Sequence, residues 1–383
     1  MTDYKSIRHA LHEHPQTAGC EEYAHDTIVK HLQGLHPDKV YTHVGGHGVI
    51  AVWGKNPQAP TVAFRADTDA LPIGHRCGHD GHTTILLRLA ELVDENISTF
   101  QRINIVLLWQ PAEETGTGSR AILDTGILQQ YNIKAFYALH NIPGYPLGTV
   151  VLCPHTFAAA STGVVYRLDG RETHASTPEM GINPGLAVSE IIQSFAQFNN
   201  LPPAAKSIDL DDWIYGLPRS RETNTFRQAT LICIRIGAPA FGTSAGHGEV
   251  MFTLRAFTND AMERLLADAN DTVNEIASKH GLNVSRTLVE PFRATENNPD
   301  CVENVRKTAK LNTEHYTLNT KDEPFRWSED FAEYLLQFPG AMFGIGSGEK
   351  QPELHHPSYD FPDALIEPAA QLFFRLACQR ANS

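Results

Sequence analysis

A seven-residue segment, RCGHDGH at Arg76–His82, brings a thiol, two imidazoles and a carboxylate close together in the sequence. Because Cys77 and His79 are two residues apart, both side chains can point to one side of an extended or looped segment, toward one ion. A soft thiolate beside an imidazole suits zinc or another late divalent metal. The ordinary alternative is a small buried cysteine beside surface histidines, and the rest of the chain has to decide between the two.

An adjacent pair of carboxylates, Glu113 and Glu114, follows an apolar run and precedes the glycine-containing segment Thr115–Gly118. Adjacent side chains there project in different directions, so one carboxylate can bind a cation while the other faces the water on that cation. A bound metal lowers the pKa of water toward about 7, and a nearby carboxylate can pass the released proton to a leaving amine. The alternative is a solvated helix start, where the helix dipole favours acids.

Two further histidines extend the set of metal-binding side chains. His140 follows an apolar run, and His355 lies in LHHPSYDF near the end of the sequence. Alone, each would be an ordinary strand-end or loop residue. Together with Cys77, His79 and one of the glutamates they supply five ligands, enough for two metal ions when a ligand or water bridges them. Paired ions of this kind are a known hydrolytic arrangement.

The elements that would position these side chains are strands alternating with helices. Continuous apolar strands are expected at Thr61–Ala66, Ile103–Trp109 and Lys134–Leu139, with a helix at Thr83–Glu95. The alternation indicates an α/β domain with a mostly parallel central sheet, which binds ligands outside the carboxyl ends of its strands. Five candidate side chains fall at such ends, namely Asp67, Asp69, Glu113, Glu114 and His140. The sequence therefore predicts one composite site.

The pattern changes near Ser161. From there the expected order is one strand, a helix, two strands, a helix and one strand, which predicts a ferredoxin-like split βαβ unit inserted into the first domain. We expect the catalytic domain at residues 1–161 and 294–383 and the inserted α+β domain at residues 162–293. The proline-rich and polar connection at Asn199–Gln228 is not assigned to elements.

Length, charge and cysteine content limit the class of protein. A chain of 383 residues is long enough for two domains. Its 31 lysines and arginines against 44 aspartates and glutamates give a net charge of −13, which argues against nucleic-acid or anionic-membrane partners. No secretory signal or bilayer-spanning apolar run is evident, and the six scattered cysteines fit reduced thiols. We expect a soluble, cytoplasmic protein.

Several longer motifs follow one another in a familiar order. They are RADTDALPI, RCGHDGH, WQPAEE, ALHNIPGYPLGTV, THASTPEMGINP, SEDFAEYL, PGAMFGIGSG and LHHPSYDF. The chain resembles, over nearly its whole length, the metal-dependent amidohydrolase/carboxypeptidase family of N-acyl-amino-acid amidohydrolases, hippurate hydrolases and auxin-conjugate hydrolases. The resemblance implies a dinuclear-metallopeptidase α/β domain interrupted by a smaller ferredoxin-like domain that commonly forms a homodimer.

The resemblance also assigns roles in the catalytic domain. It implies five metal ligands, which are Cys77, His79, Glu114, His140 and His355. Glu113 would be the general base and proton shuttle, and Asp67 and Asp80 would orient ligands from behind. Two divalent ions are implied, with zinc the first choice for a site with a thiolate and manganese, nickel or cobalt as alternatives.

Other residues would handle the substrate. His174 matches a family histidine that reaches a substrate site, often that of the partner subunit, and stabilises the developing oxyanion. Arg255 matches an arginine that holds a substrate carboxylate through its two-pronged guanidinium. A glycine-rich turn containing Gly346 and Ser347 would offer backbone donors to the same group. Their ordinary alternatives are a loop histidine, a solvent-exposed edge-strand arginine and a plain turn.

The sequence departs from the family pattern in two places. Only Gly74 and His75 separate LPI from RCGHDGH, where the family usually has a longer loop, and this should change one wall of the pocket. In the insert, Asn183 stands where an aspartate is usual, and a family asparagine is replaced within Phe241–Ser244. These changes leave the metal set whole but affect substrate identity.

The resulting hypothesis is a metal-dependent hydrolase of small molecules that cleaves the amide bond of N-acyl or N-aroyl amino acids, with metal-bound water activated by Glu113. A dipeptidase or carboxypeptidase is the alternative with the same chemistry. A metal- or ligand-binding protein with no catalytic activity is the alternative that lacks this chemistry. A structural zinc module around Cys77 would need four closed ligands and is disfavoured by the scattered partners.

Overall fold

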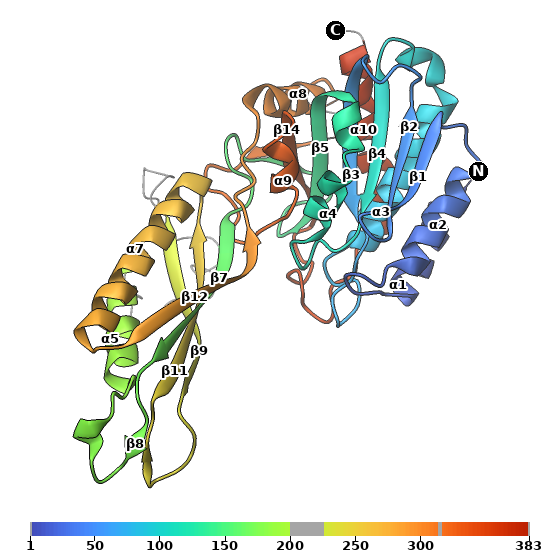
Figure 1. The fold of residues 1–383 in the computed structure, drawn as a ribbon. Helices are drawn as coiled ribbons and strands as arrows, with labels where there is room; N and C mark the ends of the chain where they lie inside the picture. Colours follow the sequence, from blue (N-terminus) through green and yellow to red (C-terminus); the bar gives the residue numbers. More distant parts are fainter. Residues whose placement is uncertain (1, 200–225, 313–315, 382–383) are drawn as a thin grey trace. The chain divides into compact units, whose positions relative to one another are not determined.

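The computed structural model describes residues 2–199, 226–312 and 316–381 and divides into two compact units (Figure 1). Unit 1 contains Met1–Phe157, Thr295–Pro324 and Glu329–Ser383, and unit 2 contains Ala158–Ala294 with Phe325–Ser328. The unit boundaries lie within four residues of those expected from the sequence, apart from the short return segment Phe325–Ser328.

The described part of unit 1 is built on an eight-stranded sheet. Its order is β1 (Lys39–Val44), β2 (Gly48–Trp53), β4 (Asn104–Gln110), β3 (Pro60–Asp67), β5 (Asn132–Pro143), β14 (Gly340–Gly348), β6 (Val150–Leu152) and β13 (Leu318–Thr320). The four central strands β4, β3, β5 and β14 are mutually parallel, whereas β1 and β2 form an antiparallel edge. All residues of β2 and β4 are buried, as expected for strands covered on both faces.

Helices cover the two faces of this sheet (Figure 1). One core cluster joins α2 (Glu22–Leu32), α3 (His79–Glu95), α8 (Pro299–Lys310) and α10 (Ile366–Ala381) with the strands, and α1 (Tyr4–Glu13) packs on α3. Tyr137 of β5 belongs to that cluster, whereas its neighbour Phe136 contacts Phe331 and Tyr334 at α9 (Ala332–Leu335). Since successive strand residues face opposite sides, α9 covers the other face, and α4 (Gly118–Asp124) packs against it. Each fully buried large apolar side chain contributes about 1.5–3 kcal/mol to this core.

Unit 2 is a four-stranded antiparallel sheet with two helices in its described part. The sheet order is β12 (Asn283–Phe292), β7 (Ala160–Asp169), β11 (His247–Ala256) and β9 (Arg227–Ile236). Residues of β11 alternate between buried and less buried, and the buried face packs on α5 (Gly185–Phe195) and α7 (Asn259–Lys279). A short pair, β8 (Thr173–His174) and β10 (Thr243–Ser244), lies beyond it. The chain order β7, α5, β9, β11, α7, β12 is that of the split βαβ unit.

The expected α/β class with an added antiparallel domain is thus confirmed, and the differences are local. The helix expected from Thr83 begins at His79, because Gly78 turns the chain in the left-handed region (φ 97°) and acts as its N-cap. The glycine-rich turn expected around Gly346 and Ser347 is instead the end of β14. Most of the unassigned connection Asn199–Gln228 lies outside the described residues.

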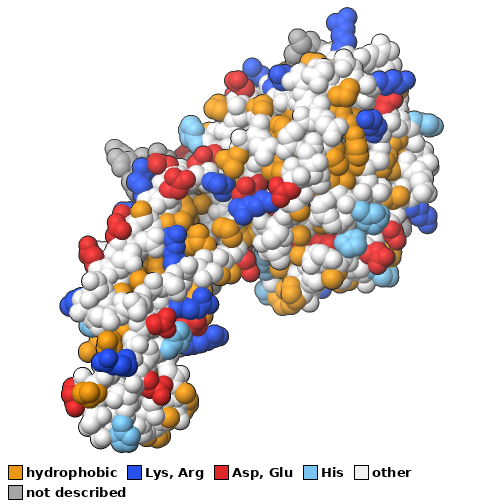
Figure 2. Space-filling model, viewed as in Figure 1, with side chains coloured by type: hydrophobic (Ala, Val, Ile, Leu, Met, Phe, Trp, Pro, Cys, Tyr) orange, Lys and Arg blue, Asp and Glu red, His pale blue; other side chains and the backbone are white. Residues whose placement is uncertain are grey.

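The surface seen in Figure 2 carries acidic and basic side chains interspersed over both units. Among the described residues, no helix is both long and apolar enough to cross a bilayer.

Candidate metal centre and active site

The candidate metal-binding side chains of unit 1 converge at the carboxyl ends of the parallel strands. Three sets have potential ligand atoms within 4.8 Å of one another: Cys77 with His79 and His140; His79 with Glu113 and Glu114; and Cys77 with Glu114 and His355. Because the sets share members, all five predicted ligands and the predicted base belong to one contiguous cluster.

The pair Cys77 and His140 lies at the buried side of this cluster. The Cys77 Sγ is 3.6 Å from His140 Nε2. His140 Nδ1 lies 2.9 Å from the backbone oxygen of Asn141 and donates to it, which leaves Nε2 as the metal-facing nitrogen. Burial raises the pKa of the Cys77 thiol to about 12 and lowers that of His140 well below its ordinary value. A neutral imidazole is suited to metal binding as it stands, whereas the thiol needs a cation to become a thiolate.

His79 occupies the centre of the cluster. Its Nδ1 donates to the backbone oxygen of Asp69 at 2.9 Å, so Nε2 is the free nitrogen. Nε2 lies 3.9 Å from Glu113 Oε2 and 4.0 Å from Glu114 Oε1. Gly78 is required here, because a Cβ at this position would come within 2.5 Å of the Asn141 side chain.

One observation in the structure, independent of the sequence motifs, indicates that these donor atoms fit a metal ion. His79 Nε2 and Glu114 Oε1 are buried and have no hydrogen-bond partner, although buried polar atoms are normally paired. Two ligands about 2.1 Å from one ion at a tetrahedral angle are about 3.4 Å apart. The separations of 3.6–4.0 Å in this cluster are close to that value. The residues therefore fit divalent cations, and thiolate, imidazole and carboxylate together are a zinc-type donor set.

The carboxylates of the two glutamates both lie near His79 Nε2 but differ in their other contacts. Glu114 Oε1 lies 3.8 Å from His355 Nε2, whereas Glu113 Oε1 accepts from the backbone N–H of Asp330 at 3.4 Å. Burial, followed by the nearby carboxylate of Glu329, raises the pKa of Glu113 well above its ordinary value. Burial also raises the pKa of Glu114, to about 7. The buried carboxylate of Glu113 is therefore suited to accept and return a proton near neutral pH.

The backbone before Glu113 is strained and held by a residue that sequence reasoning missed. Ala112 has φ 56° in the left-handed region, which is uncommon for a residue with a Cβ. Its N–H donates to Glu21 Oε1 at 2.9 Å, and the same oxygen accepts from Gly19 N–H at 3.0 Å. Glu21 is fully buried. This contact fixes the turn that aims Glu113.

His355 comes from the segment after β14 and is the most exposed ligand candidate, with 53 % of its side chain accessible. The backbone N–H of His355 donates to the backbone oxygen of Arg76 at 2.9 Å. Arg76 Nη1 in turn donates to the backbone oxygen of Tyr359 at 2.6 Å. Asn141 Nδ2 donates to the backbone oxygen of Cys77 and to Tyr359 Oη. These bonds join the two distant parts of unit 1 at the cluster.

Asp67 approaches His79 from the side of its free Nε2, so its orienting role stays a prediction, and Asp80 faces away from the ligands. Asp67 Oδ2 is 3.8 Å from His79 Nε2 and 2.7 Å from Arg65 Nη1, and its Oδ1 accepts from His82 Nδ1 at 2.7 Å. The carboxylate of Asp80 instead faces Arg8 at 3.3 Å and His12 at 2.8 Å. Because α3 begins at His79, the helix turns Asp80 away from the ligands, so the expected role of Asp80 is wrong.

A buried ionic network supports the predicted base. Arg65 Nη2 lies 2.9 Å from Glu329 and 2.8 Å from Asp330, and Gln110 Nε2 also donates to Asp330. Sequence reasoning did not assign these residues, although the motifs RADTDALPI, WQPAEE and SEDFAEYL contain them. The signal was a charged or amide side chain in each of these motifs, namely Arg65, Gln110 and the pair Glu329 and Asp330.

The expected donor role of Gly346 is also wrong, because its N–H is used inside the sheet. It donates to the backbone oxygen of Thr149 at 2.7 Å, and Ser347 is buried in the same strand.

The two candidates in unit 2 are described within that unit. His174 is exposed in β8, and its Nδ1 lies 2.7 Å from Ser176 Oγ. Arg255 lies on β11, which pairs with β7 and β9 and is therefore not an edge strand. Its Nη1 donates to the backbone oxygen of Arg326 and to Ser328 Oγ, and burial lowers its pKa.

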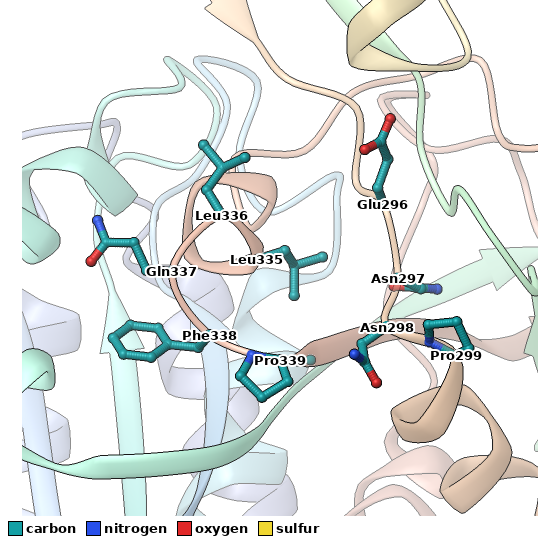
Figure 3. Close-up of a pocket in the computed structure, with 10 residues that line it drawn as sticks. Glu296, Asn297, Asn298, Pro299, Leu335, Leu336, Gln337, Phe338 and Pro339 are labelled. Carbon is teal, nitrogen blue, oxygen red and sulfur yellow. The ribbon is translucent and has the colours of Figure 1, made fainter.

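A pocket of about 460 Å³ lies elsewhere in unit 1, where Leu335 and Pro339 face Asn298 and Pro299 (Figure 3). Gly340, the first residue of β14, lines this pocket, whereas His140 of the metal-binding cluster pairs with Gly344 farther along that strand. This pocket is therefore separate from the chemistry.

Comparison with known proteins agrees with the geometry. Residues 63–379 match the model of peptidase family M20/M25/M40. The chain belongs to this family. It is 28% identical over 371 residues to an N-acetyldiaminopimelate deacetylase of Lactobacillus helveticus, covering 91% of this chain and 90% of that protein. It is also 29% identical over 398 residues to an IAA-amino acid hydrolase of Arabidopsis thaliana, covering 97% and 85%.

A solved family M20 structure has the same fold. The Bacillus subtilis YXEP protein, described as a dinuclear metal binding peptidase, superposes with a TM-score of 0.80 at 22% identity over 99% of this chain and 98% of that one. The resemblance drawn from the motifs is thereby confirmed, and the chain is a metal-binding family M20 hydrolase whose ligand groups suit two ions.

Proposed function

We propose that this family M20 protein hydrolyses the amide bond of N-acyl or N-aroyl amino acids or related small conjugates. The observation that carries the proposal is Glu113, a buried carboxylate with a raised pKa, 3.9 Å from the central ligand His79. The names of the relatives support the substrate class, since they include deacetylases of acylated amino acids and hydrolases of amino acid conjugates.

The proposed ligands Cys77, His79, Glu114, His140 and His355 would hold two divalent ions, with zinc as the first choice. Such ions, when bound, polarise an amide carbonyl and make water more acidic. Glu113 takes a proton from the attacking water and returns it to the leaving nitrogen, so its carboxylate alternates between base and acid. The backbone N–H of Asp330 and the strained turn at Ala112 keep the Glu113 carboxylate in place.

We assign substrate contacts to unit 2, as the resemblance implies. Arg255 would bind the carboxylate of the amino acid, and His174 would donate to the developing oxyanion. We further propose a homodimer through unit 2, supported by exposed apolar side chains along β9, namely Leu231, Ile232, Ile234 and Ile236. Six free cysteines support a reducing, cytoplasmic location.

The decisive experiment compares Glu113→Gln with wild type on a panel of N-acetyl, N-aroyl and free-amino dipeptide substrates. We expect the variant to fold, to keep its metal and to lose about 10²–10⁴-fold in kcat. Glu13→Gln, an exposed carboxylate of α1, is the matched control and should leave the rate unchanged.

Three outcomes would contradict the proposal. A metal-loaded Glu113→Gln protein at the wild-type rate would exclude the assigned base. Wild-type enzyme that cleaves dipeptides and leaves every acyl-amino acid intact would favour the peptidase alternative, and bound metal without turnover of any substrate would favour a silent binding protein.

A further inference from the structure

The loop that carries His174 in unit 2 is exposed, but hydrogen bonds fix its backbone on both sides of this residue. β8 pairs with β10 so that His174 lies opposite Thr243, in the connection between β9 and β11 (Figure 1). The N–H of Ala175 donates to the backbone oxygen of Gly242 at 2.9 Å, and the N–H of Thr177 donates to the oxygen of His174 at 3.0 Å. The loop therefore presents the His174 side chain from a defined backbone position.

Ser176 makes two contacts with one nitrogen of the His174 ring. Its backbone N–H donates to His174 Nδ1 at 3.1 Å, and its Oγ lies 2.7 Å from the same atom. Because a backbone N–H can only donate, Nδ1 carries a lone pair and no proton, and the hydroxyl donates to it as well. A neutral imidazole has one N–H, which is then on Nε2. Within the described residues no group bonds to this Nε2, so its N–H is available to a ligand.

The two buried histidines of the metal centre have the opposite arrangement. In His79 and His140, Nδ1 donates to a backbone oxygen and Nε2 keeps the lone pair that binds a metal. In His174, Nδ1 accepts and Nε2 keeps the proton. A ring of this second kind donates to a carbonyl oxygen or an anion, and at Nε2 it neither binds a cation nor accepts a proton. The partner of Nδ1 thus distinguishes a hydrogen-bond donor from a metal ligand.

We propose that Ser176 is a positioning residue that holds His174 as a neutral imidazole with its proton on Nε2. The inference rests on the proposed function, in which His174 donates to the oxyanion that develops at the amide carbonyl. A donor whose proton and orientation are already set does not have to reorganise as the charge develops. Ser176 touches no reacting atom in this proposal and acts only through the His174 ring.

The test observes the protons of the ring directly. Full-length, zinc-loaded protein that carries the NMR-active nitrogen isotope in its histidines is studied at about pH 8, where an ordinary histidine is neutral. The signals of His174 are those absent from the spectrum of His174→Ala. We expect wild type to show a protonated Nε2 and an unprotonated Nδ1, and Ser176→Ala to show a mixture of the two neutral tautomers.

Rate measurements on an N-acyl amino acid supply the second readout. Ser176→Ala should lower kcat about 2–10-fold, the effect of one lost hydrogen bond, with KM nearly unchanged. Ser176→Thr retains the hydroxyl and should recover both the rate and the ring signals. Ser278→Ala changes an exposed serine of α7, so this matched control should alter neither.

A protonated Nδ1 or a tautomer mixture in wild type would overturn the proposal, as would identical ring signals in wild type and Ser176→Ala. Changed ring signals with the wild-type kcat in Ser176→Ala would overturn the positioning role. Failure of the proposed function gives a different result. In that case His174→Ala would keep the wild-type kcat, although the ring signals of wild type and Ser176→Ala would still differ.

Discussion

The candidate functional residues of the two units differ in how firmly the fold holds them. In unit 1, Cys77, His79, Glu113 and His140 are buried. In both His79 and His140, Nδ1 donates a hydrogen bond to a backbone oxygen, which leaves Nε2 as the nitrogen that can bind a metal. In unit 2, His174 is exposed and bonds to a neighbouring serine, and Arg255 is half-buried. Under the proposed function, we expect unit 1 to determine the reaction and unit 2 to determine which substrate undergoes it.

Metal removal should produce the largest effect and should act only through unit 1. Chelation is expected to abolish measurable hydrolysis, because the ligand cluster would lose the ions that activate water and carbonyl. Zinc, manganese, cobalt or nickel added back singly should restore different fractions of the rate. The control is the same chelator already saturated with zinc. Full activity in protein that metal analysis shows to contain no metal would contradict the proposal that the reaction depends on ions held by unit 1.

A substitution in unit 2 should change substrate binding and leave the chemical step nearly intact. Arg255→Met is expected to raise KM about 10–100-fold, since a hydrogen-bonded ion pair to a carboxylate is worth about 1.5–3 kcal/mol, with little change in kcat. Arg255→Lys should recover part of the loss.

The contrasting substrate is an amide that lacks the carboxylate. It should be insensitive to Arg255→Met. An equal loss on both substrates would mean that Arg255 acts through its bonds to Arg326 and Ser328, as a structural residue of unit 2.

The smallest effect is expected behind Glu113, at Glu21. Glu21→Ala removes the acceptor of the Ala112 N–H and should lower kcat about 10-fold, the effect of a misplacement worth about 1.4 kcal/mol, with KM unchanged. Glu21→Gln retains an acceptor oxygen and should stay near wild type. Wild-type kcat in Glu21→Ala would show that the turn holds Glu113 without this contact.

Much of the architecture could be predicted because it depends on local pattern. The apolar strands ending in polar residues located β3, β4 and β5 within a few residues, and their order with the helices predicted the parallel sheet. The strand β6 (Val150–Leu152) was missed, since three apolar residues are too short for a periodic signal.

The candidate site likewise contains residues that local sequence motifs predict and residues whose roles depend on the three-dimensional structure. Cys77, His79 and the glutamate pair were evident because motifs place them together, and the structure brings His140 and His355 to them from elsewhere. Asp80 and Gly346 were assigned wrongly because their directions depend on where α3 begins and on how β14 pairs. Glu21 could not be found, because its importance lies in a contact with Ala112, 91 positions away.

The position of β14 has a consequence for biosynthesis. This strand lies between β5 and β6 but follows the whole of unit 2 in the chain. While the ribosome is still making residues beyond unit 2, β5 lacks its neighbour, and His355 does not yet exist. The nascent protein must therefore keep an apolar strand edge from pairing with other chains until β14, Gly340–Gly348, emerges. We expect unit 2 to fold first and metal loading to be among the last steps of maturation.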